Sequence, residues 1–316
     1  MEHTNKIACV VGPTACGKTT LGILLAQRFG GEIVSADSMQ IYRGMTIGTA
    51  APTAEEMDGV PHHMIAVADP AEQWSAARYA QVAIPIVDDI LKRGKLPILV
   101  GGTGLWLDAV VQGREFAPGQ AGGAVRRELE AQLAAEGMEP LLQELRRVDP
   151  ESAARLHPAD TKRILRALEV YRETGETITA HDERTRSLPP RYDAVWLGLR
   201  FADREDMKAL IDRRVDAMVR SGLEEEVRAL LQSGLPPSAT AWQAIGYKEF
   251  LGVLEGTATM EQAVAEVKLR SRQYAKRQLT WLRRNPAIHW MEWEKERNFE
   301  QALQLSTEIL TAAGVC

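Results

Sequence analysis

Short runs of bulky apolar residues alternate with amphipathic stretches through the first part of the chain. Residues 7–11 (IACVV) form an apolar run typical of a buried strand, and the residues after them repeat apolar positions at helical spacing. Similar patterns recur in residues 32–40, 75–94 and 96–113, and Pro85 is expected to kink or divide the helix in the second of these stretches. This alternation predicts a parallel sheet with helices on both faces.

The pattern changes at residues 114–124 (REFAPGQAGGA), where Pro and Gly are dense and mark a boundary. Residues 124–175 then show helical periodicity without a strand pattern, and a strand pattern returns near residues 194–201. We therefore predict an α/β core interrupted by an all-helical insertion. The expected segments are the first part of the core at residues 1–120, the insertion at 121–190, and a mostly helical second part of the core at 191–316.

A phosphate-binding loop is predicted between the first strand and the first helix. Residues 12–19 (GPTACGKT) match the pattern G-x-x-x-x-G-K-[ST] in the strand-to-helix context that the pattern requires. Backbone amides and the helix amino terminus would attract phosphate oxygens, Lys18 would add a cation, and the Thr19 hydroxyl could ligate Mg²⁺. These features predict a P-loop NTPase-like fold that binds a polyphosphate. The candidate phosphate-binding residues are Gly12, Pro13, Thr14, Ala15, Cys16, Gly17, Lys18 and Thr19.

The strand ends do not match those of a nucleotide-hydrolysing enzyme. In that class an apolar strand usually ends in an aspartate that holds the metal, but the apolar run LPILV ends in Gly101, Gly102 and Thr103. Asp88 and Asp89 precede that run, in a helical pattern. The second strand does end in an acid, Asp37. The pattern favours a transferase that uses a polyphosphate as a leaving group.

Composition and charge indicate where the protein is located and whether it has a basic surface. The chain is 45% hydrophobic, has a net charge of −5, and contains no apolar run near the roughly 20 residues that span a membrane. The amino-terminal residues do not resemble a secretory leader, and the three cysteines lack disulfide or zinc spacing, so we expect a cytoplasmic protein. Residues 268–284 contain seven basic residues and no acidic one. Taken alone, such a run is usually a solvated helix face.

Seven stretches between residues 12 and 284 resemble the tRNA dimethylallyltransferases of bacterial type, also called tRNA isopentenyltransferases. They are GPTACGKT, SADSMQIYRGMTIGTAAP, PHHMI, GGTGLWLDAVVQG, HPADTKRILRALEVYRETG, IGYKEF and AKRQLTWLRR, in the family's order. The combination of DSMQIYRG and AKRQLTW is far more specific than the phosphate loop. The resemblance implies transfer of the dimethylallyl group from dimethylallyl diphosphate to the exocyclic amine of the adenine 3′-adjacent to the anticodon, with Mg²⁺ and without ATP.

The resemblance also implies roles for particular residues. Asp37 is the candidate general base, Thr103 lies near both substrates, and Arg214 or the adjacent Arg213 meets the diphosphate. The tRNA anticodon stem-loop is the implied partner, and with it the basic run gains a function. The candidate tRNA-binding residues are Asp37, Ser38, Met39, Gln40, Thr103, Arg126, Lys162, Arg163, Ile164, Leu165, Arg166, Gln243, Ala244, Ile245, Gly246, Tyr247, Lys248, Lys276, Arg277, Gln278, Leu279, Thr280, Trp281, Leu282 and Arg283.

Three features of the sequence raise questions about the roles of particular residues. Cys16 stands where the family usually has serine; simple packing is favoured, but a thiol at a helix amino terminus could instead be reactive and protected from alkylation by diphosphate. His62 and His63 suggest a metal pair, although structural histidines are favoured. Gln243 is less basic than expected for an RNA contact.

Three other functions compete with transfer to tRNA. An adenylate isopentenyltransferase would place the same group on free AMP or ATP, but it needs neither the helical insertion nor the basic segment. A small-molecule P-loop kinase lacks support because the strand-end aspartate is missing. A non-catalytic RNA-binding protein with a vestigial loop is disfavoured because Lys18, Thr19, Asp37 and Thr103 are all present. A monomer would suffice for the predicted reaction.

Overall fold

The computed structural model of the chain describes residues 5–113, 115–117 and 122–315, and it divides into two compact units. The larger unit comprises Met1–Gly113 together with Arg191–Cys316, and the smaller comprises Arg114–Pro190. The boundary expected at residues 120 and 121 falls on positions outside the described residues. Each unit contains its own cluster of buried apolar side chains, so each is built around a separate core.

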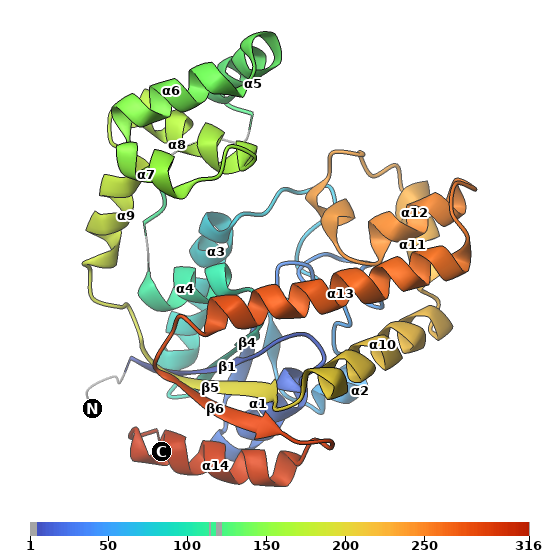
Figure 1. Cartoon of the computed structure of the whole chain (residues 1–316). Coiled ribbons are helices and arrows are strands. Elements are labelled where there is room, and N and C mark those ends of the chain that lie inside the picture. The colour runs from blue at the N-terminus through green and yellow to red at the C-terminus, as the bar shows by residue number, and fades with distance from the viewer. Residues whose placement is uncertain (1–4, 114, 118–121, 316) are drawn as a thin grey trace. The chain divides into compact units, whose positions relative to one another are not determined.

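A six-stranded parallel sheet forms the centre of the larger unit (Figure 1). Its strand order is β3-β2-β4-β1-β5-β6, and the central strands are buried on both faces, as expected for apolar runs of this kind. The predicted P-loop-like α/β fold is confirmed. The strands are β1 (Lys6–Val11), β2 (Glu32–Ala36), β3 (His62–His63), β4 (Pro97–Gly101), β5 (Asp193–Phe201) and β6 (Ile288–Trp293).

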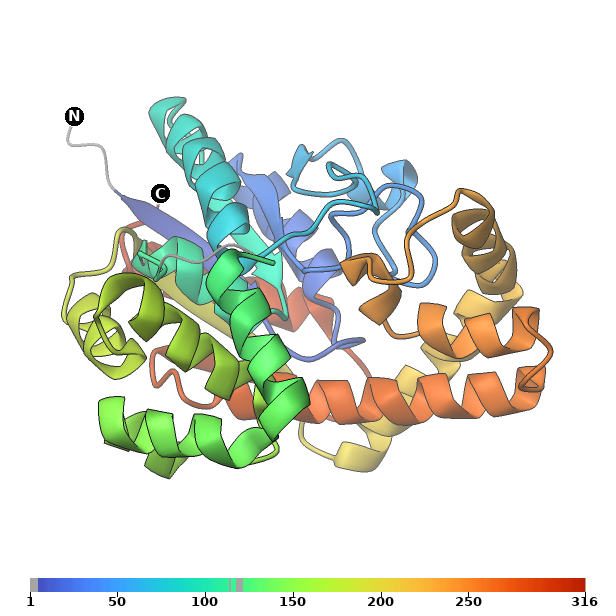
Figure 2. The ribbon, with the colours of Figure 1, turned by 90° about the horizontal axis from the view of Figure 1, so that it is seen from above.

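Helices cover both faces of this sheet. Helices α1 and α14 pack together on one face, while α3, α4, α10 and α13 lie on the other (Figure 1). Helix α10 runs beside α13, as the view from above also shows (Figure 2). The helices of this unit are α1 (Lys18–Phe29), α2 (Ala54–Met57), α3 (Ala76–Lys92), α4 (Gly104–Gln112), α10 (Arg204–Arg220), α11 (Leu223–Gln232), the 3₁₀ helix η1 (Thr240–Gln243), α12 (Tyr247–Leu254), α13 (Met260–Leu282) and α14 (Phe299–Ala312).

Helix α3 is continuous through Pro85, so the expectation that this proline divides the helix is wrong. A proline removes one backbone hydrogen bond from a helix interior. Here the Ser75 side chain caps the first turn, and Tyr79, Ala83 and Val87 are buried on the face that packs against the sheet and α4. Tertiary packing therefore holds the helix together across the proline.

The smaller unit is helical in its described residues. Leu129, Leu141, Leu145 and Leu168 are fully buried there and form the centre of its core. Its helices are α5 (Ala124–Glu136), α6 (Met138–Val148), α7 (Pro150–Arg155), α8 (Thr161–Thr174) and α9 (Ile178–Arg186). Across both units, none of the described helices combines the length and the apolar character that crossing a bilayer requires.

Candidate active site

Three adjacent strands end beside one another at the carboxyl edge of the sheet. The strand order β2-β4-β1 places the phosphate loop after β1, Thr103 just after β4 and Asp37 directly after β2. Gly101 pairs with both Val11 and Ala36, so the three strand ends are level. After β1 the chain continues to β2 on one side of that strand, and after β4 it continues to β5 on the other side. Ligands of open α/β sheets bind at the carboxyl ends of the strands where the strand order reverses in this way. The fold therefore brings the predicted phosphate loop to the same edge of the sheet as Asp37 and Thr103, the residues predicted to act on the adenine.

The phosphate loop leaves the amino terminus of α1 uncapped. Gly17, the N-cap residue, has φ 93°, in the left-handed region that a side chain disfavours, and it supplies no side-chain cap to the first turn. Ala15 also adopts φ 67°, a strained conformation that turns the loop back on itself. The Lys18 ammonium donates to the Pro13 carbonyl oxygen at 2.8 Å, across the loop. The loop and the first turn of α1 thus present backbone amides beside one cation, which is an anion-binding arrangement.

Arg214 on α10 faces the phosphate loop, whereas the neighbouring Arg213 is exposed. Arg214 is partly buried, and it lines both cavities beside the loop, whereas Arg213 lines only the larger one. Burial lowers the pKa of Arg214, and the carboxylate of Asp37 opposes that effect. A guanidinium in this position lacks full hydration and would gain from an anionic ligand. Of the two arginines left open by the sequence, Arg214 is the better placed.

Hydrogen bonds hold the residues after β2 and β4 together. One carboxylate oxygen of Asp37 accepts from the Met39 amide at 2.9 Å, which leaves the other oxygen available to a ligand. The Thr103 hydroxyl oxygen accepts from the Ser38 amide at 3.3 Å. The Gln40 amide group donates to the carbonyl oxygens of residues 49 and 50 at 3.3 and 3.1 Å. Gln40 therefore fixes the loop, while Asp37 and Thr103 remain close to each other.

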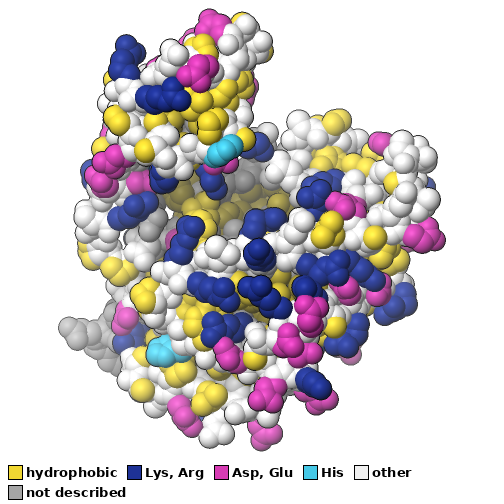
Figure 3. All heavy atoms as spheres, in the orientation of Figure 1, with side chains coloured by type: hydrophobic (Ala, Val, Ile, Leu, Met, Phe, Trp, Pro, Cys, Tyr) yellow, Lys and Arg dark blue, Asp and Glu magenta, His cyan; other side chains and the backbone are white. Residues whose placement is uncertain are grey.

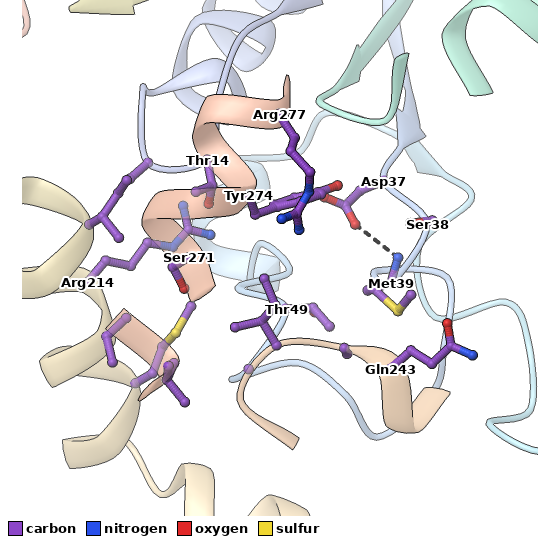
Figure 4. Close-up of a pocket in the computed structure, with 18 residues that line it drawn as sticks. Thr14, Asp37, Ser38, Met39, Thr49, Arg214, Gln243, Ser271, Tyr274 and Arg277 are labelled. Carbon is purple, nitrogen blue, oxygen red and sulfur yellow. Dashed lines mark hydrogen bonds between the residues drawn. The ribbon is translucent and has the colours of Figure 1, made fainter. Parts of the chain in front are cut away.

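Two cavities adjoin these residues. The larger, about 1000 Å³, extends over the phosphate loop and includes Lys18, Thr19 and Arg297 among its lining residues. The smaller, about 210 Å³, combines the apolar side chains of Ile211, Val215, Met218 and Val267 with polar groups. Figure 4 shows side chains directed into the smaller cavity from different elements, among them Arg214, Asp37 and Tyr274. A charged group and a small apolar group could therefore bind next to each other.

The sequence did not single out Tyr274 or Arg297 as site residues. Tyr274 lies on α13 and points towards Asp37 (Figure 4). Burial, with a smaller contribution from Asp37, raises the pKa of Tyr274 to about 12, while the neighbouring Thr103, Arg277 and Gln278 act in the opposite direction. Arg297 lies in the connection between β6 and α14. A helical face that also carries Gln278 could have indicated Tyr274, but no sequence pattern pointed to Arg297.

The position of Cys16 favours simple packing over a reactive thiol. The Cys16 side chain is fully buried within the core cluster on the α1 side of the sheet. Burial raises the pKa of this thiol and outweighs the nearby charge of Lys18. The Trp293 indole N–H donates to the Cys16 carbonyl oxygen at 2.8 Å, which fixes the loop from the side of β6. Cys16 can contribute only its backbone to phosphate binding.

Both histidines of the adjacent pair have protein partners. The Nδ1 atom of His62 lies 2.8 Å from the Val60 carbonyl oxygen, and the Nε2 atom of His63 lies 2.9 Å from a carboxylate oxygen of Glu32. No cluster of three or more His, Cys, Asp or Glu side chains within the described part of the chain could hold a metal ion. The contacts agree with a structural role for the pair.

The candidate tRNA-binding residues include exposed, partly buried and fully buried side chains. Lys and Arg side chains gather over α13 on the face that Figure 3 shows. The exposed candidates are Lys162, Arg163, Gln243, Lys248, Lys276, Arg277, Thr280, Trp281 and Arg283. Seven candidates are buried and cannot present their side chains to RNA, because each helix or loop turns one side towards the protein interior. They are Ile164, Leu165, Ala244, Gly246, Tyr247, Gln278 and Leu282.

The partly buried basic candidates of the smaller unit already have partners. Arg126 forms an ion pair with Glu130 at 2.8 Å. Arg166 pairs with Glu169 at 2.9 Å and donates to the Ala117 carbonyl oxygen at 2.6 Å. Within the segment 162–166 the exposed cations are therefore those at 162 and 163. Of the candidates in this unit, these two side chains are the most open to RNA, although Arg163 also lies 3.5 Å from Asp160.

The fold and the site together define a P-loop-like α/β protein in which an anion-binding type of loop lies on the same sheet edge as a carboxylate. A family model described as IPP transferase matches residues 40–285. A tRNA dimethylallyltransferase of Halalkalibacterium halodurans is 44% identical over 287 residues, which cover 91% of each chain. One from Geobacillus thermodenitrificans is 44% identical over 296 residues, covering 94% of this chain and 93% of the relative. The chain belongs to the IPP transferase family.

Solved structures support the same assignment. The crystal structure of the full-length tRNA isopentenylpyrophosphate transferase from Bacillus halodurans matches with a TM-score of 0.72 and 40% identity, covering 99% of this chain and 97% of that one. A eukaryotic dimethylallyltransferase acting on tRNA matches with a TM-score of 0.83 and 29% identity, covering 97% of this chain and 80% of that one. The likeness therefore extends over both units.

Proposed function

We propose that this chain transfers a dimethylallyl group from dimethylallyl diphosphate to the exocyclic amine of the adenine 3′-adjacent to the anticodon of tRNA. Its relatives, named tRNA dimethylallyltransferases, support the reaction class. The observation that carries the proposal is the common edge at which the phosphate loop, Asp37 and Thr103 meet. A diphosphate ester and a nucleophile could react across that edge.

In the proposed reaction the adenine nitrogen forms a bond to the first carbon of the dimethylallyl group. The bond from that carbon to the diphosphate oxygen breaks, and inorganic pyrophosphate leaves. The adenine amine is a weak nucleophile and must lose a proton, which the free carboxylate oxygen of Asp37 would accept. The Thr103 hydroxyl would orient the amine. It accepts from the amide of Ser38, the residue after Asp37, and so lies beside the proposed base at the same edge of the sheet. The smaller cavity offers apolar walls for the five-carbon group.

Stabilising the departing pyrophosphate would be the task of the phosphate loop. The uncapped amides of α1, the Lys18 ammonium and the Arg214 guanidinium would neutralise the charge that develops on the leaving oxygen. The Thr19 hydroxyl lines the same cavity and fits Mg²⁺, which takes oxygen ligands and commonly shares phosphate oxygens. When bound, Mg²⁺ would supply further positive charge to the diphosphate.

The anticodon stem-loop is the proposed RNA partner. The reacting adenine must leave the stack to reach a site at a sheet edge, which costs a few kcal/mol. Exposed cations and Trp281 on α13 could offset that cost by binding phosphates and stacking on a base. One chain carries every group assigned here, so we expect a monomer to be active. We place the reaction in the cytoplasm, because the buried Cys9 and Cys16 are free thiols.

Transfer to free AMP or ATP, and phosphoryl transfer by a kinase, are less well supported. The relatives and the solved structures are named for action on tRNA. Helix α13 also carries exposed basic side chains that a free nucleotide would not need. The β4 strand ends in glycines rather than in the aspartate that holds a metal in P-loop kinases.

The test is a transfer assay with labelled dimethylallyl diphosphate and three acceptors: an unmodified tRNA transcript, AMP and ATP. We expect label in tRNA alone, located on the adenine after the anticodon by nuclease digestion and mass spectrometry. An Asp37→Asn variant should bind the same tRNA but transfer about 10²- to 10⁴-fold more slowly, because general bases contribute factors of that size.

Two other results would contradict different parts of the proposal. Label that enters only AMP or ATP would make the protein an adenylate isopentenyltransferase. Unchanged transfer by the Asp37→Asn variant would remove Asp37 as the base, while leaving the transfer reaction itself intact.

A further inference from the structure

Gln278 is buried on α13 and its side chain joins two loops that are far apart in the sequence. Its side chain is 5% exposed. The side-chain oxygen accepts from the Thr14 backbone N–H at 2.8 Å, and the side-chain nitrogen donates to the Gly102 carbonyl oxygen at 3.2 Å. One amide group therefore connects the phosphate loop to the turn that follows β4.

The contact at Gly102 is unusually close. A methyl group added to Gly102 would lie 2.1 Å from the side-chain nitrogen of Gln278, which no side chain could tolerate without displacing one of the two. The turn therefore depends on a glycine so that the glutamine can reach its carbonyl oxygen. This arrangement is specific for an amide, because one end must accept a hydrogen bond and the other must donate one.

The two loops joined by Gln278 carry different halves of the proposed reaction. Thr14 belongs to the loop that would hold the diphosphate, and Gly102 precedes Thr103, which would orient the adenine amine. Tyr274 lies one helical turn before Gln278, and its side chain points towards Asp37 (Figure 4). The same helix exposes Lys276, Arg277 and Trp281 to solvent. One face of α13 thus contacts the reaction site while another could contact RNA.

We propose that Gln278 is a positioning residue that fixes the phosphate loop and the Thr103 turn relative to each other. It is not a tRNA contact, because its side chain is buried and both ends of its amide are hydrogen-bonded to the protein. This inference rests on the proposed transfer reaction. Reacting atoms must be held within a fraction of an ångström of their productive separation, and a misplacement of about 1 Å can cost about 10²-fold in rate.

The test compares Gln278→Met with Gln273→Met. Methionine matches the length of glutamine but makes neither hydrogen bond, so it removes the tie with little change in volume. Gln273 lies on the same helix and is exposed, with a single long contact to Arg270 at 3.5 Å, so its variant controls for the substitution itself. Measurements are kcat and both KM values for tRNA transfer, pyrophosphate binding by calorimetry, and hydrogen exchange of the Thr14 amide.

We expect Gln278→Met to lower kcat about 10- to 100-fold, with KM for dimethylallyl diphosphate and Kd for pyrophosphate within about threefold of the wild type. The Thr14 amide should exchange faster, and Gln273→Met should match the wild type throughout. A Gly102→Ala variant, which displaces the amide without removing it, should show the same loss of kcat.

Three results of the kinetic and binding measurements would overturn the inference: kcat of Gln278→Met within twofold of the wild type, weakened pyrophosphate binding with kcat unchanged, or equal losses in both glutamine variants. Hydrogen exchange at Thr14 does not require activity. If the wild type transfers no label to tRNA, the proposed function fails, while accelerated exchange in Gln278→Met still shows that the tie exists. Unchanged exchange would show that the tie itself is absent.

Discussion

The carboxylate of Glu226 holds the loop at residues 46–48 beside the site. One of its oxygens accepts from the backbone amides of Thr46 and Ile47, each at 2.8 Å, and from the Thr46 hydroxyl at 3.1 Å. The other accepts from the Gly48 amide at 3.0 Å and from the Tyr247 hydroxyl at 2.5 Å. Burial, assisted by this carboxylate, raises the pKa of Tyr247 and keeps its hydroxyl a donor. Five donors therefore converge on one side chain, which lies on α11.

A Glu226→Gln substitution should destabilise the larger unit by about 3 kcal/mol. In its best orientation the substituted side chain accepts from Thr46 and Ile47 with its amide oxygen. Its NH₂ group then donates to the Tyr247 hydroxyl, which can rotate to accept. The Gly48 N–H then faces the amide NH₂ group, and an unpaired, partly buried donor costs about 1–3 kcal/mol. Loss of the charge weakens the Ile47 hydrogen bond by about 1 kcal/mol, while the Thr46 contacts are exposed and count for little.

Calorimetry of the full chain can measure this effect. A loss of about 3 kcal/mol should lower the Tm of the larger unit by about 6–12 °C, since about 1 kcal/mol shifts a unit of this size by about 2–4 °C. Gly48 also lines the smaller cavity, so KM for dimethylallyl diphosphate should rise. Glu225→Gln is the control, because Glu225 is exposed on the same helix. A Tm of Glu226→Gln within about 2 °C of the wild type would refute the reasoning.

Three further predictions concern charge and burial. Arg214→Gln should weaken pyrophosphate binding about 10- to 100-fold by calorimetry, since a charged hydrogen bond is worth about 1.5–3 kcal/mol, whereas Arg213→Gln should change it less than about threefold. Cys16 should resist iodoacetamide equally with and without pyrophosphate until urea unfolds the chain, as mass spectrometry would show; alkylation of the folded protein would contradict its burial. A hydrogen bond from Arg93 lowers the pKa of Glu32 below its ordinary value of 4.5. The ionised Glu32 carboxylate therefore stabilises the folded state above pH 4.5, and this contribution is lost as the pH falls below that value. Glu32→Gln should therefore flatten the fall in Tm between about pH 5 and pH 3, and parallel curves would count against this assignment.

The elements that form the sheet edge could be predicted from the sequence because each depends on local pattern. The phosphate loop follows from glycine spacing and its strand-to-helix context, and Asp37 and Thr103 follow from their places after apolar strands. Parallel strands bring their carboxyl ends to one edge, so the meeting of these residues needed only the correct strand order. That order, with β4 between β1 and β2, came from the structure.

The side chains that the sequence misplaced depend on packing between distant elements. Tyr274 and Gln278 lie in a basic run, but the rotation of α13 turns them towards the sheet and leaves Lys276 outside. Cys16 stands at a helix amino terminus, where exposure would make a thiol reactive. Its burial comes from residues near the carboxyl end of the chain, such as Trp293, which local pattern does not connect with the loop.

The position of β1 in the sheet has a consequence for the order in which the protein can be completed during synthesis. This first strand is hydrogen-bonded to β4 on one side and to β5 on the other, and β5 follows the whole helical insertion. The contacts that support the phosphate loop come later still: Trp293 binds the Cys16 carbonyl oxygen, and the Phe299 ring fills the space beside Gly17.

The ribosome therefore releases the phosphate loop first, yet the loop reaches its final packing only after almost the whole chain has emerged. The smaller unit is one continuous segment with its own core, so its contacts are all available much earlier. A growing chain can thus present a finished insertion while the polyphosphate site is still incomplete. The packing around the loop is complete only once the start of α14 has been synthesised, because Phe299 is the first residue of that helix.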